Sequence, residues 1–259
     1  MSTVREWLKD NPGLRAAAWF HVPLVLLAML GLLFDHRQIL GINAWIKPLK
    51  FDLSVFIYLI TAAGILSGVV GWRRSRLVIG WGICLAMVVE DLIISMQSFR
   101  GVRSHMNFST LFDGVAFGIM GIFITLNTLL IAWLLVLICF NRTAWAKPVA
   151  WGVRVGLLAM VAGSVEGVLM VTHGAHTVGA ADGSPGLFFV NWSRQYGDLR
   201  VAHFFAIHAL QAMPLLGWLL TRSTLPQRAQ LALVVAGFLA YMGVVGILFQ
   251  QAMAAHPLL

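Results

Sequence analysis

The sequence predicts an all-α integral membrane protein, a helical bundle of about seven transmembrane helices. Hydrophobic residues make up 59% of its 259 residues and charged residues only 11%, whereas an ordinary soluble domain carries about 25% charge. Long apolar runs recur along the chain, each near the ~20 residues that cross a bilayer core. A chain so poor in charge cannot cover a surface that faces water, and a lipid bilayer as its partner removes that requirement.

The predicted elements begin with an N-terminal interfacial segment, residues 1–15. Within it, residues 3–10 are expected to form a short amphipathic helix that ends at Asn11-Pro12-Gly13. The predicted spans lie near residues 16–34, 51–71, 77–98, 111–139, 149–172, 199–221 and 229–252. The fourth span is long enough that it must tilt or protrude. No linker rich in Pro, Gly or Ser divides the chain, so residues 1–259 are predicted to form a single transmembrane domain with a long outer loop at 173–198.

The distribution of basic residues predicts the orientation. With the N-terminus in the cytoplasm, the inner segments hold eleven Lys and Arg residues and the outer segments seven, which agrees with the positive-inside rule. The C-terminus is then expected outside. Because the net charge of +8 sits between apolar runs, it is interpreted as topogenic charge, and no nucleic-acid partner is expected.

Small residues recur at the spacing that lets helix backbones approach one another. The pairs are Gly64/Gly68, Gly114/Gly118, Gly152/Gly156 and Gly163/Gly167. They predict a closely packed bundle.

Ionisable residues gather toward the predicted outer side, and an ionisable residue inside a membrane marks a site or a buried pair. The candidate haem ligands are His173, His176, His203 and His208. The candidate metal ligands are Glu166, Glu90, Asp91 and His105. Two adjacent carboxylates in lipid need a proton or a cation, and the candidate cations for Glu90 and Asp91 are Arg100, Arg103 and Arg200.

Other polar residues have a structural interpretation. Asp198 is expected to be the N-cap of the sixth span, and Thr110 to Asp113 resembles a capping box of the fourth. Asp35, His36 and Asp52 are expected to be solvated at the interface, and His21 to hydrogen-bond a neighbouring helix.

Three segments carry a resemblance to a known family. They are Asn43–Phe51 (NAWIKPLKF), Arg100–Asn107 (RGVRSHMN) and Gly197–Gln211 (GDLRVAHFFAIHALQ). Together they resemble a family of multi-spanning bacterial proteins that has no assigned activity, and the resemblance covers most of the chain. It implies a location in the bacterial cytoplasmic (inner) membrane and identifies no catalytic residue.

The functional hypotheses stay open at this point. The first is haem b held between histidines of facing helices for electron transfer, with a quinone or another redox partner. The second is a metal-dependent membrane hydrolase that uses a divalent metal, although the Ser/His/Asp/His signature of seven-helix zinc hydrolases is missing. A transporter or small-molecule sensor is the third, and a discontinuous helix within residues 35–50 would be its mark. A chain with no cofactor, in which water and carboxylates satisfy the histidines, is the fourth.

Overall fold

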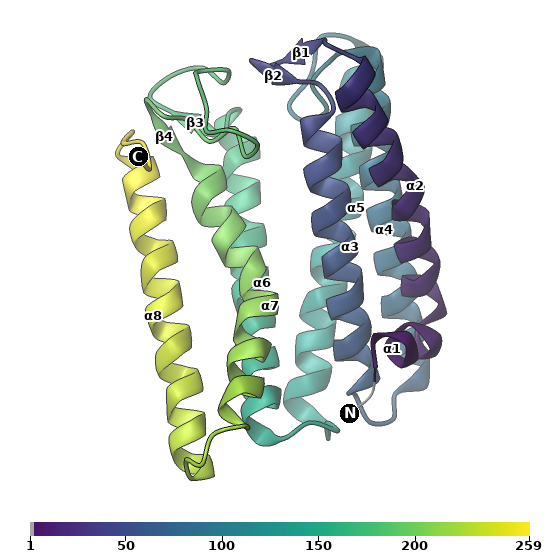
Figure 1. The fold of residues 1–259 in the computed structure, drawn as a ribbon, viewed down its shortest axis with the longest axis vertical. Helices are drawn as coiled ribbons and strands as arrows, with labels where there is room; N and C mark the ends of the chain where they lie inside the picture. The colour runs from purple at the N-terminus through teal and green to yellow at the C-terminus, as the bar shows by residue number, and fades with distance from the viewer. Residues whose placement is uncertain (1–2) are drawn as a thin grey trace. The chain divides into compact units, whose positions relative to one another are not determined.

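The computed structural model describes residues 3–259 and confirms the all-α fold class (Figure 1). Seven of its helices are long and apolar enough to cross a membrane. The helices are α1 Val4–Asp10, α2 Pro12–Phe34, α3 Ile46–Ser67, α4 Arg73–Arg100, α5 Leu111–Phe140, α6 Lys147–His173, α7 Leu199–Leu220 and α8 Gln227–Met253. Two short antiparallel pairs complete the described chain: β1 Gln38–Ile39 with β2 Ile42–Asn43, and β3 Thr177–Val178 with β4 Gly197–Asp198.

The predicted spans agree with the observed helices within a few residues, except for the second. This helix, α3, begins at Ile46 and ends at Ser67, whereas the predicted span covers residues 51–71. Pro48 lies in its first turn, where a proline is tolerated because the backbone N–H has no helical acceptor there. Hydropathy marks the apolar part of a helix and misses such a polar first turn.

The described chain divides into two compact units. Unit 1 comprises the residues up to Ser67, Gly71–Leu130 and Phe188–Asn191, and therefore holds α1 to α4 and most of α5. Unit 2 comprises Gly68–Val70, Ile131–Leu187 and Trp192–Leu259, and holds the end of α5, all of α6 to α8, and β3 and β4. The expectation of a single transmembrane domain stays a prediction.

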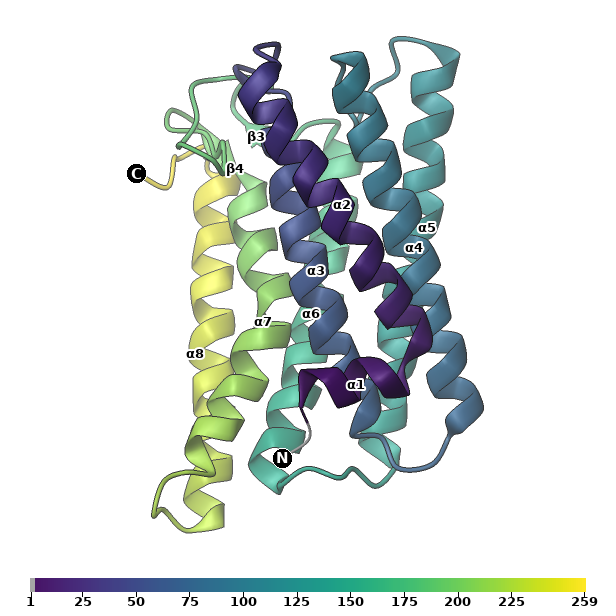
Figure 2. The same ribbon diagram turned by 45° about the vertical axis from the view of Figure 1, so that its right-hand side comes forward.

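In unit 1, the helix α2 packs against α3 and α4, and the short helix α1 packs against the C-terminal end of α3 and the start of α2 (Figure 2). The Asn11 side chain follows α1 and donates hydrogen bonds to Ala63 O at 3.2 Å and Ser67 Oγ at 3.0 Å. The Trp7 ring packs over Gly64, where an added Cβ would lie 3.0 Å from the ring. The predicted amphipathic helix at the N-terminus is thus present and fastened to α3.

In unit 2, α6 and α7 pack with their backbones in close contact, as the glycine spacing predicts. A Cβ added to Gly152 would lie 2.3 Å from Met213 O, and one added to Gly156 would lie 2.8 Å from Ala209 O. Helix α8 packs on α7, where Tyr241 donates a hydrogen bond to Phe205 O at 2.8 Å. The α5 pair behaves differently, because a Cβ at Gly118 would meet nothing among the described residues within 4 Å. Gly114/Gly118 is therefore not a helix-packing motif, and the interpretation of that pair was wrong.

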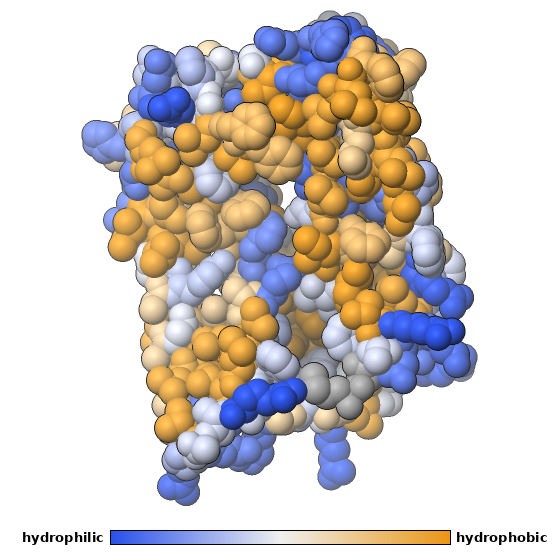
Figure 3. Space-filling model, in the orientation of Figure 1, coloured by the Kyte–Doolittle hydropathy of each residue, from blue (hydrophilic) through white to orange (hydrophobic). Residues whose placement is uncertain are grey.

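Large apolar side chains remain exposed along the helices. Leu33 and Ile122 are each 68% exposed and Leu239 is 64% exposed. Figure 3 shows broad apolar areas along the helices and many hydrophilic residues near their two ends. Apolar side chains have no unfavourable contact with water when they face lipid tails, so this surface fits a bilayer environment.

Candidate cation site in unit 1

Three ionisable side chains from three helices meet in the interior of unit 1. His21 comes from α2, Asp52 from α3 and Asp91 from α4. Their exposed fractions are 0%, 0% and 1%, and one ligand atom of each lies within 4.8 Å of those of the other two. We call this group the buried triad.

The hydrogen bonds of His21 determine which ring nitrogen carries a proton. Nδ1 lies 2.7 Å from Ala17 O, and a carbonyl oxygen can only accept, so Nδ1 must donate. Nε2 lies 2.8 Å from Asp91 Oδ2. At that distance a proton lies between nitrogen and oxygen, either as an imidazolium–carboxylate pair or as a protonated Asp91 beside a neutral ring. The expected bond from His21 to a neighbouring helix is confirmed.

Asp52 is the least satisfied member of the triad. Neither of its carboxylate oxygens has a hydrogen-bond donor among the described residues, and Asp91 Oδ1 also lacks one. A buried carboxylate without a donor costs several kcal/mol unless it is protonated or bound to a cation. Asp52 was expected to be solvated at the interface. That interpretation was wrong, because this face of α3 packs against α2 and α4.

A second pair of ionisable groups lies beside the triad. Glu90 precedes Asp91 on α4 and is 6% exposed, and its Oε1 lies 3.5 Å from Nε2 of His105. The other nitrogen of His105, Nδ1, accepts a hydrogen bond from Lys47 Nζ at 3.0 Å. We call Glu90 and His105 the loop pair, because His105 lies between α4 and α5.

The arginines predicted to neutralise Glu90 and Asp91 have other partners. Arg100 pairs with Asp113 of α5, and Arg200 pairs with Asp198 at 2.6 Å. Arg103 contacts Met106 O at 3.4 Å. Histidines take the expected place of the arginines, since His21 pairs with Asp91 and His105 with Glu90.

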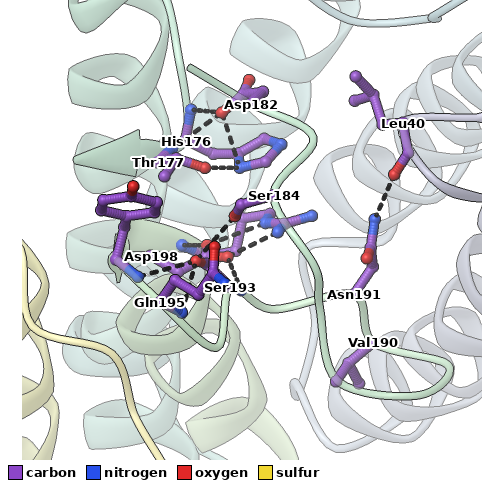
Figure 4. Close-up of polar contacts among 12 residues, drawn as sticks. Leu40, His176, Thr177, Asp182, Ser184, Val190, Asn191, Ser193, Gln195 and Asp198 are labelled. Carbon is purple, nitrogen blue, oxygen red and sulfur yellow. Dashed lines mark hydrogen bonds and ion pairs between the residues drawn. The ribbon is translucent and has the colours of Figure 1, made fainter. Parts of the chain in front are cut away.

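The predicted haem ligands His173 and His176 lie at the end of α6 and beyond it. Helix α6 ends at His173, and Gly174 follows in the left-handed conformation with φ 74°, so His176 does not continue the helix. His173 is exposed, and its Nδ1 lies 3.1 Å from Ala175 O. His176 Nδ1 lies 3.1 Å from Asp182 Oδ1, and the same oxygen accepts from the Thr177 backbone N–H at 3.0 Å (Figure 4).

The other candidates in unit 2 lie on α6 and α7. His203 Nδ1 donates to Gly163 O at 2.8 Å, and His208 Nδ1 donates to Phe204 O at 2.8 Å. The His208 ring also stacks on the Phe204 ring, with centroids 4.0 Å apart. Glu166 is 7% exposed, and its Oε1 has no hydrogen-bond partner in the described chain.

The predicted caps are present. The Asp198 side chain accepts from Arg200 N at 3.1 Å as the N-cap of α7, and it also accepts from Ser193 N at 2.8 Å (Figure 4). The Thr110 hydroxyl accepts from Asp113 N at 3.1 Å at the start of α5. These residues shape the helix ends and the loop before α7.

Sequence reasoning selected Asp91 and missed the other two members of the triad. Two signals could have found them. His21 and Asp52 are ionisable residues inside apolar helices, and helices that follow one another in the chain, such as α2, α3 and α4, are usually neighbours in space. The triad offers one imidazole and two carboxylates, a ligand set that suits divalent transition metals such as zinc.

Comparisons with known proteins found no matching family model, no matching curated protein and no matching solved structure. The chain is described by its own geometry, as a multi-pass membrane protein of seven long apolar helices with a buried His/Asp group.

Proposed function

We propose that this protein binds a divalent transition-metal ion within the bilayer, at His21, Asp52 and Asp91. The observation that carries the proposal is Asp52, which is fully buried and has no hydrogen-bond donor for either oxygen among the described residues. A cation held by all three side chains would satisfy these oxygens and Asp91 Oδ1 together.

Charge and distance both fit an ion of this class. Two carboxylates and a neutral imidazole carry a net charge of −2, which one divalent ion cancels, and cancellation is favoured in a medium of low dielectric constant. Zinc lies about 2.0–2.2 Å from nitrogen and oxygen ligands, so ligand atoms within 4.8 Å of one another reach a common ion after small side-chain movements. The imidazole favours transition metals over magnesium or calcium.

The burial of the triad side chains favours ion transport over hydrolysis. A hydrolytic metal must meet both a substrate and water, whereas the three side chains here are at most 1% exposed. Ionisable groups inside membrane helices commonly mark ion and proton pathways. We therefore place ion transport ahead of the metal-dependent hydrolase. The discontinuous helix expected of a transporter within residues 35–50 is not present, because this described segment forms the β1–β2 hairpin and the first turn of α3. The case for ion transport therefore depends on the buried triad.

The test is metal titration of the purified, metal-depleted protein in lipid nanodiscs. Cobalt(II) absorption and calorimetry with zinc should both report one site per chain. Asp52→Asn removes a direct ligand and should weaken binding by about a hundredfold or more, since loss of an outer-shell partner already costs about 10–100-fold. Asp10→Asn, which changes an exposed aspartate of α1, is the matched control and should bind as the wild type does. Wild-type affinity in a folded Asp52→Asn protein, or no binding by the wild type, would rule out the proposal.

Haem b is a second candidate, and it concerns unit 2. Nδ1 of His203 and His208 each donates to a backbone carbonyl, which orients Nε2 as the ligating nitrogen, as in many metal-bound histidines. The proposal includes a quinone or another redox partner and a bacterial inner-membrane location. A reduced-minus-oxidised spectrum with a Soret band, lost in His203→Ala or His208→Ala, would support it. A colourless protein from cells supplied with haem precursor would eliminate it.

A further inference from the structure

Glu90 and Asp91 are neighbours on α4, but their side chains contact different residues. Asp91 faces His21 in the buried triad, and Glu90 faces His105 in the loop that follows α4. Glu90 is 6% exposed, and its Oε2 has no hydrogen-bond partner among the described residues. A second buried carboxylate oxygen without a hydrogen-bond partner in the described chain thus lies one residue away from the triad, which indicates that an ion is also bound beside Glu90.

His105 connects this carboxylate to the end of the helices. Its side chain is 31% exposed, so one edge of the ring meets the surroundings while Nε2 points toward Glu90. The Lys47 ammonium can only donate, so His105 Nδ1 accepts and the proton of the neutral ring lies on Nε2. A neutral ring is the form of histidine that binds metals.

Helix lengths place two of the three triad residues, Asp52 and Asp91, nearer to one end of unit 1, whereas His21 lies about 14 Å from Pro12 and about 20 Å from Phe34 on α2. At a rise of 1.5 Å per residue, Asp52 lies about 9 Å from the start of α3 at Ile46, and Asp91 lies about 14 Å from the end of α4 at Arg100. From the opposite ends of the same helices the distances are about 22 Å and about 27 Å. The nearer end is the one that carries the β1–β2 hairpin and the loop of His105 (Figure 1).

We propose that Glu90 and His105 form the entrance for the cation of the buried triad, so that an ion entering from the hairpin end binds the loop pair before it reaches Asp91 and Asp52. The inference rests on the proposed function of the triad. Lys47 is the tethered cation of this entrance: its ammonium remains at His105 until the incoming ion displaces it. An ion in transit would be held by Nε2 of His105 and by the Glu90 carboxylate. Departure of the Lys47 ammonium would let Nδ1 take up a proton from water as Nε2 releases its own, so that the ring stays neutral and Nε2 is open to the ion.

Loading kinetics test the entrance separately from the site. Metal-free protein in nanodiscs is mixed with cobalt(II) in a stopped-flow spectrometer, and the rise of the cobalt absorption gives the association rate constant. His105→Gln and Glu90→Gln should each lower it by about tenfold or more, because the charge and ligands that concentrate the ion at the entrance are lost. The dissociation rate constant should fall in parallel, so that the equilibrium affinity stays within about twofold of the wild-type value, since both variants retain all three ligands of the triad.

Lys47→Gln should act in the opposite direction and accelerate loading, because it removes the positive charge that repels the ion and holds the ring in the tautomer with its proton on Nε2. Lys50→Gln is the matched control: Lys50 lies one turn further along α3, and its Nζ donates to Val190 O at 3.0 Å. It should load at the wild-type rate. Thermal unfolding of each variant verifies that it is folded.

The outcomes separate the two proposals. If Asp52→Asn abolishes binding but His105→Gln and Glu90→Gln load at the wild-type rate, the entrance is refuted and the site stands. If His105→Gln abolishes equilibrium binding, His105 is a ligand of the final site and the entrance is again refuted. If the wild type binds no cobalt, or Asp52→Asn binds it normally, the proposed function fails and the entrance fails with it.

Discussion

Three histidines in the membrane helices, His21, His203 and His208, each donate from Nδ1 to a backbone carbonyl. Two of the acceptors, Ala17 O and Phe204 O, lie four residues earlier on the same helix. In each case the contact leaves Nε2 as the nitrogen directed away from that carbonyl. In His21, Nε2 contacts a carboxylate of another helix, Asp91 Oδ2, at 2.8 Å.

The hydrogen bonds of Asn11 are expected to stabilise the contact between α1 and α3. Asn11→Ala removes the hydrogen bonds of a side chain that is 4% exposed, and each buried bond contributes about 1 kcal/mol. We expect the free energy of unfolding to fall by about 1–3 kcal/mol, measured by denaturant titration in detergent. Gln227→Ala, at the exposed start of α8, is the control. Equal stability of the two variants would contradict the role of Asn11.

Ionisation of Asp35, at the end of α2, is expected to make the stability of the fold depend on pH. Hydrogen bonds from Arg37, and then from Trp45 Nε1, hold the pKa of Asp35 well below its usual value of 3.8. Because the pKa is lower in the folded state, the stabilisation is present above the unfolded value and is lost as the pH falls through the folded pKa. The wild type should therefore unfold at a higher temperature than Asp35→Asn at neutral pH.

This difference between the wild type and Asp35→Asn should shrink progressively below about pH 4, where the unfolded carboxyl takes up its proton. The measurement is the unfolding temperature of both proteins as a function of pH. A difference that stays constant down to about pH 2 would show that ionisation of Asp35 does not stabilise the fold.

At the scale of elements, the packing of α6 on α7 depends on glycines. The Cβ of Gly152→Ala would lie 2.3 Å from Met213 O, an atom of the α7 backbone that cannot rotate away. Overpacking of this kind costs about 1–3 kcal/mol, so the unfolding temperature in detergent should fall clearly. Gly118→Ala, whose Cβ would meet nothing within 4 Å in the described chain, should leave it nearly unchanged. If both variants unfold like the wild type, the α6–α7 contact is looser than described.

The chain as a whole predicts which side of the membrane each terminus occupies. Seven crossings place the termini on opposite sides, and the excess of basic residues in the predicted inner segments favours a cytoplasmic N-terminus. Alkaline phosphatase fused after Leu259 should therefore be active in a bacterial host, because that enzyme requires the oxidising periplasm. The same reporter fused after Ser223, in the loop between α7 and α8, should be inactive. The reverse pattern would invert the orientation, and the entrance formed by His105 and Glu90 would then face the cytoplasm.

The candidate site could be predicted from the sequence only in part. Glu90 and Asp91 are conspicuous because they are adjacent carboxylates in an apolar run. A charged side chain inside the bilayer costs free energy whichever face of the helix carries it. His21 and Asp52 each have an ordinary alternative, a single hydrogen bond or solvation at the interface. Periodicity describes which residues of one helix share a face, and it does not say which face of another helix they meet.

The sequence by itself determined the number, order and approximate limits of the long helices, because the requirement for about 20 apolar residues in a bilayer acts on each segment separately. It also determined the glycine contacts of α6 and the caps at Asp198 and Thr110, which depend on residues close together in the chain or on one helix face. Tertiary structure alone decided that His21, Asp52 and Asp91 meet and that histidines, not arginines, contact the carboxylates of Glu90 and Asp91. Such pairings depend on the rotation and depth of three helices packed together, and residues 70 positions apart, such as His21 and Asp91, carry no local signal of their contact.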